Sequence, residues 1–161
     1  MHSTGKTERL LRAYFDHEHR KGAEVIARFA KVADGWQGGR TLDFGCGAGG
    51  LTYRIAETCR EAVGIDIVQY KLDFAHAQAA HLGTRNVEFV HYDGSFDCVV
   101  CVDVVEHLPT PEYFGAEFRR VLAPGGQLLL SFGPPWGHPH GKHMWAKIQA
   151  GGRTRSSPAA P

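Results

Sequence analysis

Apolar residues recur at helical spacing in the first part of the chain and gather in short runs after it. A short stripe covers residues 10–15, and a longer one from Ala23 to Ala33 follows one helical face. Short apolar and β-branched runs then predict five strands, separated by helical segments, near residues 40–44, 62–66, 87–91, 97–102 and 126–132. This alternation predicts an α/β fold whose parallel sheet is wound by right-handed crossovers. A ligand is expected at the carboxyl ends of the strands.

A glycine-rich turn follows the first predicted strand. Asp43 ends the apolar run, glycines occupy every second position from Gly45 to Gly49, and a helix is expected to begin near Leu51. Glycine is needed because the turn requires backbone angles that side chains forbid, and because a ligand must approach the main chain closely. The segment 42–50 therefore predicts a nucleotide-binding turn.

Two classes of ligand fit the spacing of this turn. Gly45, Gly47 and Gly50 match the G-x-G-x-x-G pattern of dinucleotide-binding proteins. Asp43 would repel a pyrophosphate at the start of the helix, whereas it would attract the ammonium and sulfonium groups of S-adenosylmethionine (SAM). The charge at this position favours SAM, and an NAD-dependent oxidoreductase is kept as an alternative.

From about Ala23 to about Trp145 the chain resembles the class I SAM-dependent methyltransferases, in particular the methyltransferase type 11-like domains. The resemblance rests on the acid-x-G-x-G-x-G turn that begins at Asp43 and on five later segments, which are 62–67, 86–93, 95–101, 103–108 and 118–130. It implies a doubly wound Rossmann-like sheet, mostly parallel, that lacks the usual last two strands. It also implies methyl transfer from SAM to a small-molecule acceptor.

The resemblance further implies which residues serve the cofactor. The residues in its cofactor-binding positions are Asp43, Gly45, Cys46, Gly47, Gly49, Asp66, Ile67, Asp93, Gly94 and Asp103. In the family, the acid at Asp66 accepts hydrogen bonds from the ribose hydroxyls. The residue at Ile67 lies against the adenine, and the acid at Asp93 faces the adenine amino group.

One histidine is the candidate catalytic residue. His107 follows the fourth predicted strand, where family members place the acceptor, and a histidine there could take a proton from a hydroxyl at neutral pH. Asp103, Glu106 and His107 also resemble a cluster that binds a divalent metal in ubiquinone-pathway O-methyltransferases. The same letters are common in relatives without a metal, so no metal is expected.

Composition narrows the setting. The 161 residues are 43% hydrophobic with a net charge of +1, which gives one globular domain and no general attraction to nucleic acid. No apolar run approaches the length of a membrane span, and the first residues lack the apolar core of a signal peptide. A cytoplasmic protein is expected. Cys98 and Cys101 spell C-x-x-C but face opposite sides of a predicted strand, which makes them core cysteines.

The sequence departs from the family pattern in two places. Only Gly94 and Ser95 stand between Asp93 and Phe96, where family members carry a longer loop and where a crossover normally needs a dozen residues. A strained link, a shortened fourth strand or a deletion is expected there. After residue 132 the chain is rich in Gly, Pro and Ser, so the fifth strand is expected to be an exposed apolar edge that favours self-association.

These features divide the chain into three expected parts and keep a further alternative open. The parts are an N-terminal helical segment at 1–22, the SAM-binding domain at 23–145 and a disordered tail at 146–161. The alternative is a catalytically silent remnant or interaction module that keeps the fold and binds SAM weakly.

Overall fold

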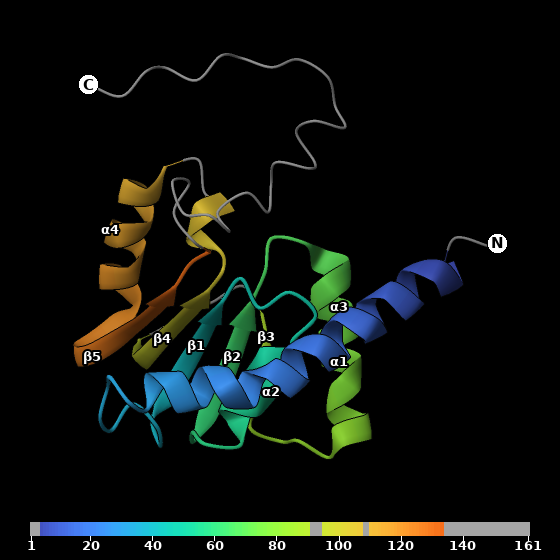
Figure 1. Ribbon diagram of the computed structural model, residues 1–161, viewed down its shortest axis with the longest axis horizontal. Coiled ribbons are helices and arrows are strands. Elements are labelled where there is room, and N and C mark those ends of the chain that lie inside the picture. Colours follow the sequence, from blue (N-terminus) through green and yellow to red (C-terminus); the bar gives the residue numbers. More distant parts are fainter. Residues whose placement is uncertain (1–3, 91–94, 108–109, 134–161) are drawn as a thin grey trace, which may run out of the picture. The chain divides into compact units, whose positions relative to one another are not determined.

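The computed structural model describes residues 4–90, 95–107 and 110–133 (Figure 1). Residues 1–131 form one compact unit and residues 132–161 another. All the described elements belong to the first unit, and in chain order they are α1 (Thr4–Phe29), β1 (Arg40–Phe44), α2 (Gly50–Ala56), β2 (Glu61–Ile65), α3 (Gln69–Leu82), β3 (Val87–Phe89), β4 (Phe96–Val102), the 3-10 helix η1 (Val105–His107), α4 (Pro111–Val121) and β5 (Leu122–Ser131). None of these helices is long and apolar enough to span a bilayer.

The five strands form one parallel sheet in the order β3-β2-β1-β4-β5. The chain moves outward from β1 to β3, returns to the other side of β1 and continues to β5. This is the doubly wound α/β architecture that the sequence predicts. The first, second and fourth strands lie within one residue of their predicted positions.

Alternating strand residues face two different layers of helices. Leu42, Val99 and Cys101 are buried on the face that Phe118 of α4 covers. Cys98 belongs to the cluster on the opposite face, which α1 and α2 cover. Both cysteines are fully buried and free, which confirms that they are core residues. The sheet therefore has a hydrophobic core on each face.

Helix α1 runs without a break through the first predicted stripe and most of the second, and it packs along α2 (Figure 1). It ends at Phe29, so the last residues of the second stripe, 30–33, lie beyond the helix. The helices approach closely because glycine stands at the contact. A Cβ at Gly22 would lie 2.8 Å from a carbon of the Arg54 side chain, and one at Gly50 would overlap the carbonyl oxygen of Phe15. The expected boundary between residues 22 and 23 falls inside this helix, and the three-part division of the chain stays a prediction.

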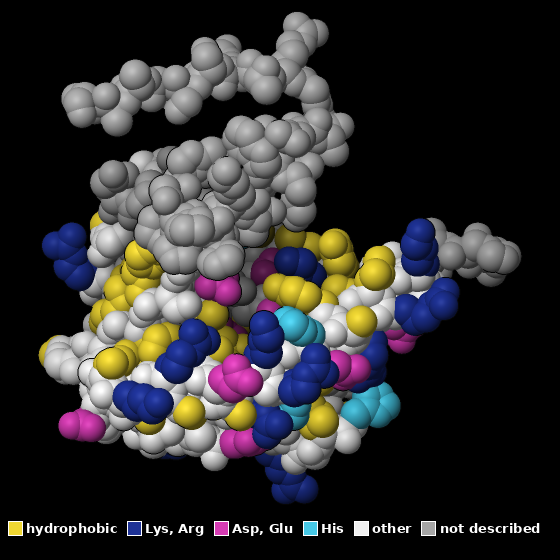
Figure 2. Space-filling view, viewed as in Figure 1, with side chains coloured by type: hydrophobic (Ala, Val, Ile, Leu, Met, Phe, Trp, Pro, Cys, Tyr) yellow, Lys and Arg dark blue, Asp and Glu magenta, His cyan; other side chains and the backbone are white. Residues whose placement is uncertain are grey.

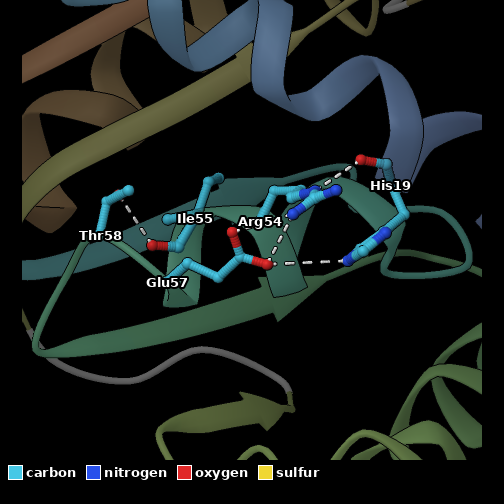
Figure 3. A network of polar contacts seen from close by, with 5 residues as sticks. All are labelled: His19, Arg54, Ile55, Glu57 and Thr58. Atoms are coloured by element: carbon cyan, nitrogen blue, oxygen red, sulfur yellow. Dashed lines mark hydrogen bonds and ion pairs between the residues drawn. The ribbon is translucent and has the colours of Figure 1, made fainter.

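Arg54 of α2 ties the two helices together (Figure 3). Its Nε donates a hydrogen bond of 2.8 Å to the carbonyl oxygen of His19, and its Nη1 donates to both carboxylate oxygens of Glu57 at 2.8 and 3.0 Å. The Nε2 of His19 lies 3.9 Å from the same Glu57 carboxylate. Arg54 and Glu57 thus hold α1 at His19.

The third strand is shorter than predicted because the link to β4 is short. Phe89 of β3 lies level with Asp43 of β1, whereas Phe96 begins β4, which is three strands away from β3, four residues below that level. Three strand spacings and four residues of rise separate these ends by about 19 Å, which seven Cα–Cα steps can span. A strand that ran to residue 91 would leave five steps, or about 18 Å, for a gap of about 24 Å. The chain length therefore shortens β3, and β4 keeps seven residues.

The fifth strand begins earlier than predicted. It starts at Leu122, directly after α4, and its register against β4 shifts between Phe96 and Cys98. Gly125, with φ of 81°, lies in this irregular part of the strand. On the α4 face of this edge strand, Leu128 and Leu130 each remain 39% exposed. Among the described strands, β5 pairs only with β4.

Candidate functional site

The glycine turn joins β1 to α2 and is anchored to the end of β2. Gly45, Gly47 and Gly49 all have positive φ, at 79°, 57° and 87°, which is the conformation that the sequence required of them. The N–H groups of Gly45 and Cys46 donate to the carbonyl oxygen of Ile65 at 2.9 and 2.8 Å. The turn is therefore held at the carboxyl edge of the sheet, where the sequence places a ligand.

Asp66, just beyond β2, closes the turn from the other side. Its Oδ2 accepts the N–H of Gly47 at 3.0 Å, and its Oδ1 accepts the N–H of Val68 at 2.8 Å. The Nζ of Lys71 lies 3.6 Å from Oδ2. Each carboxylate oxygen can accept a further hydrogen bond, because an ionised carboxylate offers about four acceptor positions. Asp66 thus holds the glycine turn and can still bind a hydroxyl.

Asp43 lies beneath the turn with only 2% of its surface exposed. The buried hydroxyl of Thr52 donates to its Oδ2 at 2.6 Å. Burial raises the pKa of Asp43 to about 7, the Thr52 hydrogen bond opposes that rise, and the charge of Asp66 adds to it. A cation beside a buried carboxyl with a raised pKa stabilises the ionised form of that carboxyl and so binds favourably there.

Helix α1 brings two further polar groups to the turn. A Cβ at Gly47 would lie 2.9 Å from the Tyr14 ring and 3.3 Å from Oε1 of Glu18. Burial raises the pKa of Glu18 to about 8 and Asp43 adds to the rise, while Tyr14, the N–H of Gly50 and Lys71 oppose it. Burial, followed by the charge of Glu18, also raises the pKa of Tyr14. Both residues belong to the site, although sequence reasoning did not select them.

A sequence signal for these two residues exists. Tyr14 and Glu18 are four positions apart, so they share a helical face with the apolar residues that pack on the domain. Burying an unpaired charge is costly, so a carboxylate on the buried face of a helix indicates a partner group or a ligand. The apolar stripe alone predicted a covering helix and gave no reason to examine its acid.

Two cavities adjoin along this edge of the sheet. The first, of about 750 Å³, lies between α1 and the ends of β1 and β4, and its lining includes Glu18 and Asp43. The second, of about 640 Å³, has Asp66 and His107 in its lining. Both cavities include the same four residues in their walls, which are Tyr14, Gly45, Asp103 and Val104. The shared wall makes one elongated ligand a natural occupant of both.

The charges at the site differ between its floor and its rim. Asp43 is a buried acid at the floor of the first cavity, whereas the basic residues in the lining, Lys21, Arg28 and Lys31, are exposed and lie in α1 or just after it. Figure 2 shows Lys and Arg side chains mixed with Asp and Glu on the face that carries α1 and α2. The inner part of the site therefore favours a cation, and its outer part carries both signs.

The remaining sequence-predicted residues lie at different places. Ile67 is fully exposed and lines the second cavity, and Asp103 has a positive φ of 55° in the shared wall. A Cβ at Gly49 would meet Ala75 and Phe89 at 2.9 Å, so this glycine serves the packing of α3 and β3. Cys46 lines the first cavity. Asp93 and Gly94 lie outside the described residues.

His107 and its neighbours follow β4 in the short helix η1. The N–H of Asp103 donates to the carbonyl oxygen of Ser131 at 2.9 Å, and the N–H of His107 donates to Val104 at 2.9 Å. The first bond holds the segment after β4 against the end of β5, and the second closes the turn that leads to His107 beside the second cavity. Within the described residues no group of three or more His, Cys, Asp or Glu side chains is arranged to hold a metal ion.

Comparison with known proteins gives a consistent picture. A family model described as a methyltransferase domain matches residues 42–130. The ubiquinone biosynthesis O-methyltransferase of Idiomarina loihiensis is 31% identical over 107 residues, which cover 61% of this chain and 44% of that protein. The chain thus spans about half the length of the curated relatives it matches or less.

Solved structures match the fold. The PH0226 protein of Pyrococcus horikoshii superimposes with a TM-score of 0.57 at 28% identity and covers 68% of this chain and 55% of its own. The [4+2]-cyclase SpnF has a TM-score of 0.57 at 29% identity, with coverage of 68% and 43%. The family model spans more than half of the 161 residues and includes the glycine turn, Asp66 after β2 and Asp103 after β4. The chain therefore belongs to the methyltransferase-domain family.

Proposed function

We propose that this chain binds SAM across the two adjoining cavities and transfers its methyl group to a small-molecule acceptor. The observation that carries the proposal is the pair of carboxyl groups, Asp43 and Glu18, at the glycine turn. Burial raises the pKa of both carboxyl groups, so a cationic group beside them would stabilise their ionised forms. SAM carries an ammonium and a sulfonium, and family membership supports the same cofactor.

The same carboxyl groups argue against a dinucleotide. A pyrophosphate at this turn would lie beside Asp43 and Glu18, and it would repel their ionised carboxylates most strongly where water is excluded. The G-x-G-x-x-G spacing alone does not offset that repulsion. An NAD-dependent oxidoreductase is therefore the weaker candidate.

Each part of the cofactor has residues suited to it. Asp66 would accept the ribose hydroxyls, because both its oxygens keep acceptor capacity beside the second cavity. Ile67 would lie against the adenine, with Asp93 and Gly94 as its expected neighbours. The methionyl end would lie in the first cavity near Asp43, and no metal is needed to hold it.

For methyl transfer, the main task of the protein is to align the acceptor with the methyl group of SAM. SAM supplies a methyl group on an excellent leaving group, so the protein must hold the acceptor in line and exclude water. His107 lines the second cavity, and its imidazole can take a proton from a hydroxyl acceptor. The relatives named as ubiquinone biosynthesis O-methyltransferases make phenolic hydroxyls the first acceptors to test. His107→Gln is then expected to slow methyl transfer to a phenol by about 100-fold without weakening SAM binding.

A direct test is titration calorimetry of SAM and S-adenosylhomocysteine (SAH) with the folded chain. Micromolar binding of both ligands is expected, with loss in Asp66→Ala and none in Asp73→Ala, where the exposed acid lies on α3. Because Asp66 also holds Gly47, the backbone of the Asp66 variant must be checked by circular dichroism. Folded protein that binds neither ligand would refute the proposal.

A second candidate is a methyltransferase fold without catalysis. The short connection between Phe89 and Phe96 favours it, because family members carry a longer loop beside the adenine. The cyclase among the structural relatives also illustrates that one fold hosts more than one activity. Binding of SAM without turnover of any phenol, amine or carbon acceptor would favour this candidate.

A further inference from the structure

The Glu18 carboxylate lies at the glycine turn with one oxygen unused. Its Oε2 is buried and has no hydrogen-bond partner among the described residues. A Cβ at Gly47 would lie 3.3 and 3.6 Å from the two carboxylate oxygens, which places them against the loop. The same side chain lines the first cavity together with Asp43. An unpartnered buried oxygen beside a ligand cavity is costly unless a ligand group meets it.

Helix α1 is held against the domain on both sides of Glu18. Its Cβ lies 2.7 Å from the Cβ that would be built on Gly50, so α1 rests directly on the start of α2. The next residue along the helix, His19, accepts the Arg54 hydrogen bond shown in Figure 3. The carboxylate is therefore presented by a helix that is fixed on both sides of it.

We propose that Glu18 is a specificity-determining residue that recognises the positive charge of SAM and so favours SAM over SAH. This inference rests on the proposed function, because it assumes that the methionyl end lies in the first cavity. The two ligands differ by one methyl group and by the charge on sulfur. A residue that senses that charge would promote release of the product after methyl transfer.

The electrostatic surroundings support this role. The titratable groups that act on Glu18 are Tyr14 on its own helix, Asp43 from β1 and Lys71 from α3, and Asp43 is more deeply buried than Lys71. Burial favours the protonated form of Glu18, and a sulfonium nearby favours the ionised form. SAM would therefore displace more of this proton than SAH, because SAH carries the ammonium but not the sulfonium. The energy of a charge pair at a partly buried site is large enough to alter a binding ratio by about tenfold.

The test compares the dissociation constants of SAM and SAH in four proteins. They are the wild type, Glu18→Gln, Glu18→Asp and the control Glu8→Gln, which changes an exposed acid of the same helix. In Glu18→Gln the preference for SAM over SAH is expected to fall about tenfold, with little change in SAH affinity. Glu18→Asp keeps the charge and is expected to retain most of the preference, and Glu8→Gln all of it.

Proton release gives a second, independent measurement. Titrations at pH 7 in buffers of different ionisation enthalpy count the protons released on binding. The wild type is expected to release more protons with SAM than with SAH, and Glu18→Gln is expected to lose that excess.

An unchanged ratio and unchanged proton release in folded Glu18→Gln would overturn the role of Glu18 and leave the proposed function intact. Failure of the wild type to bind either ligand would instead refute the proposed function, and this inference with it.

Discussion

Replacing Asp43 by asparagine is expected to stabilise the fold at neutral pH while weakening SAM binding. Asn has nearly the same shape, and its carbonyl oxygen can still accept the hydroxyl of Thr52, now 2.6 Å from Oδ2. What the variant loses is an acid that is 2% exposed. Burying a charge without a full set of partners is costly, so its removal relieves the folded state.

The size of the effect follows from the pKa. Burial raises the pKa of Asp43 from 3.8 to about 7, so between those pH values the unfolded chain releases a proton that the folded chain keeps. The unfolded state then binds fewer protons, and the free energy of unfolding falls as pH rises through this window. At about 1.4 kcal/mol for each pKa unit, the free energy of unfolding above pH 7 is lower, by on the order of 4 kcal/mol, than at acidic pH, where Asp43 is protonated in both states.

Urea unfolding at pH 4.5 and pH 7.5 measures this loss. Part of the loss in the free energy of unfolding occurs below pH 4.5, and the repulsion among Asp43, Glu18 and Asp66 is spread over all three groups. Between the two pH values the wild type is therefore expected to lose about 2 to 3 kcal/mol more than Asp43→Asn. Asp73→Asn, at an exposed position of α3, should follow the wild type. If the wild type and Asp43→Asn lose stability in parallel, Asp43 does not hold its proton in the folded state and the reasoning fails.

Further substitutions test the packing of the domain and its self-association. Gly50→Ala is expected to lower the free energy of unfolding by about 1 to 3 kcal/mol in a urea titration, because the new Cβ meets the backbone of α1. The control Gly115→Ala places its Cβ in open space on α4 and should raise the free energy of unfolding by about 0.5 to 1 kcal/mol. Arg54→Ala removes the bonds of Figure 3 and is expected to speed hydrogen exchange in α1 before any other helix; uniform acceleration would count against the tie. We also propose that the β5 edge joins two copies of the chain, so Leu130→Lys should reduce self-association in sedimentation velocity while the control Val32→Lys, at another exposed apolar residue, leaves it unchanged.

The sequence predicted the parts of the fold that local pattern determines. The apolar runs located the strands because buried parallel strands need continuous apolar residues. The glycines at 45, 47 and 49 predicted positive φ because side chains disfavour that conformation. Cys98 and Cys101 were assigned to the core from the alternation of a strand alone.

Features that depend on distant contacts were missed or misplaced. The end of β3 at Phe89 follows from the distance to β4, which no local pattern records. The role of Glu18 depends on how α1 is rotated about its axis, and that rotation is set by Gly22, Gly50 and Arg54 at the contact with α2. Spacing along the chain showed which residues share a face, but tertiary packing decides which cavity that face meets.

The two ends of the proposed cofactor site depend on different parts of the chain, and this separates two possible defects. The methionyl end is built from α1 and the ends of β1 and β4, with Glu18 and Asp43 as its acids. The adenine end depends on the residues that follow Phe89, where the link to β4 is short. Adenosine is common to SAM and SAH, so a weak adenine end would lower both affinities by the same factor. The ratio of the two affinities would still report on Glu18, because only SAM carries the sulfonium charge. A low affinity with a preserved preference for SAM would therefore locate the defect in the short link and leave the acidic end of the site intact.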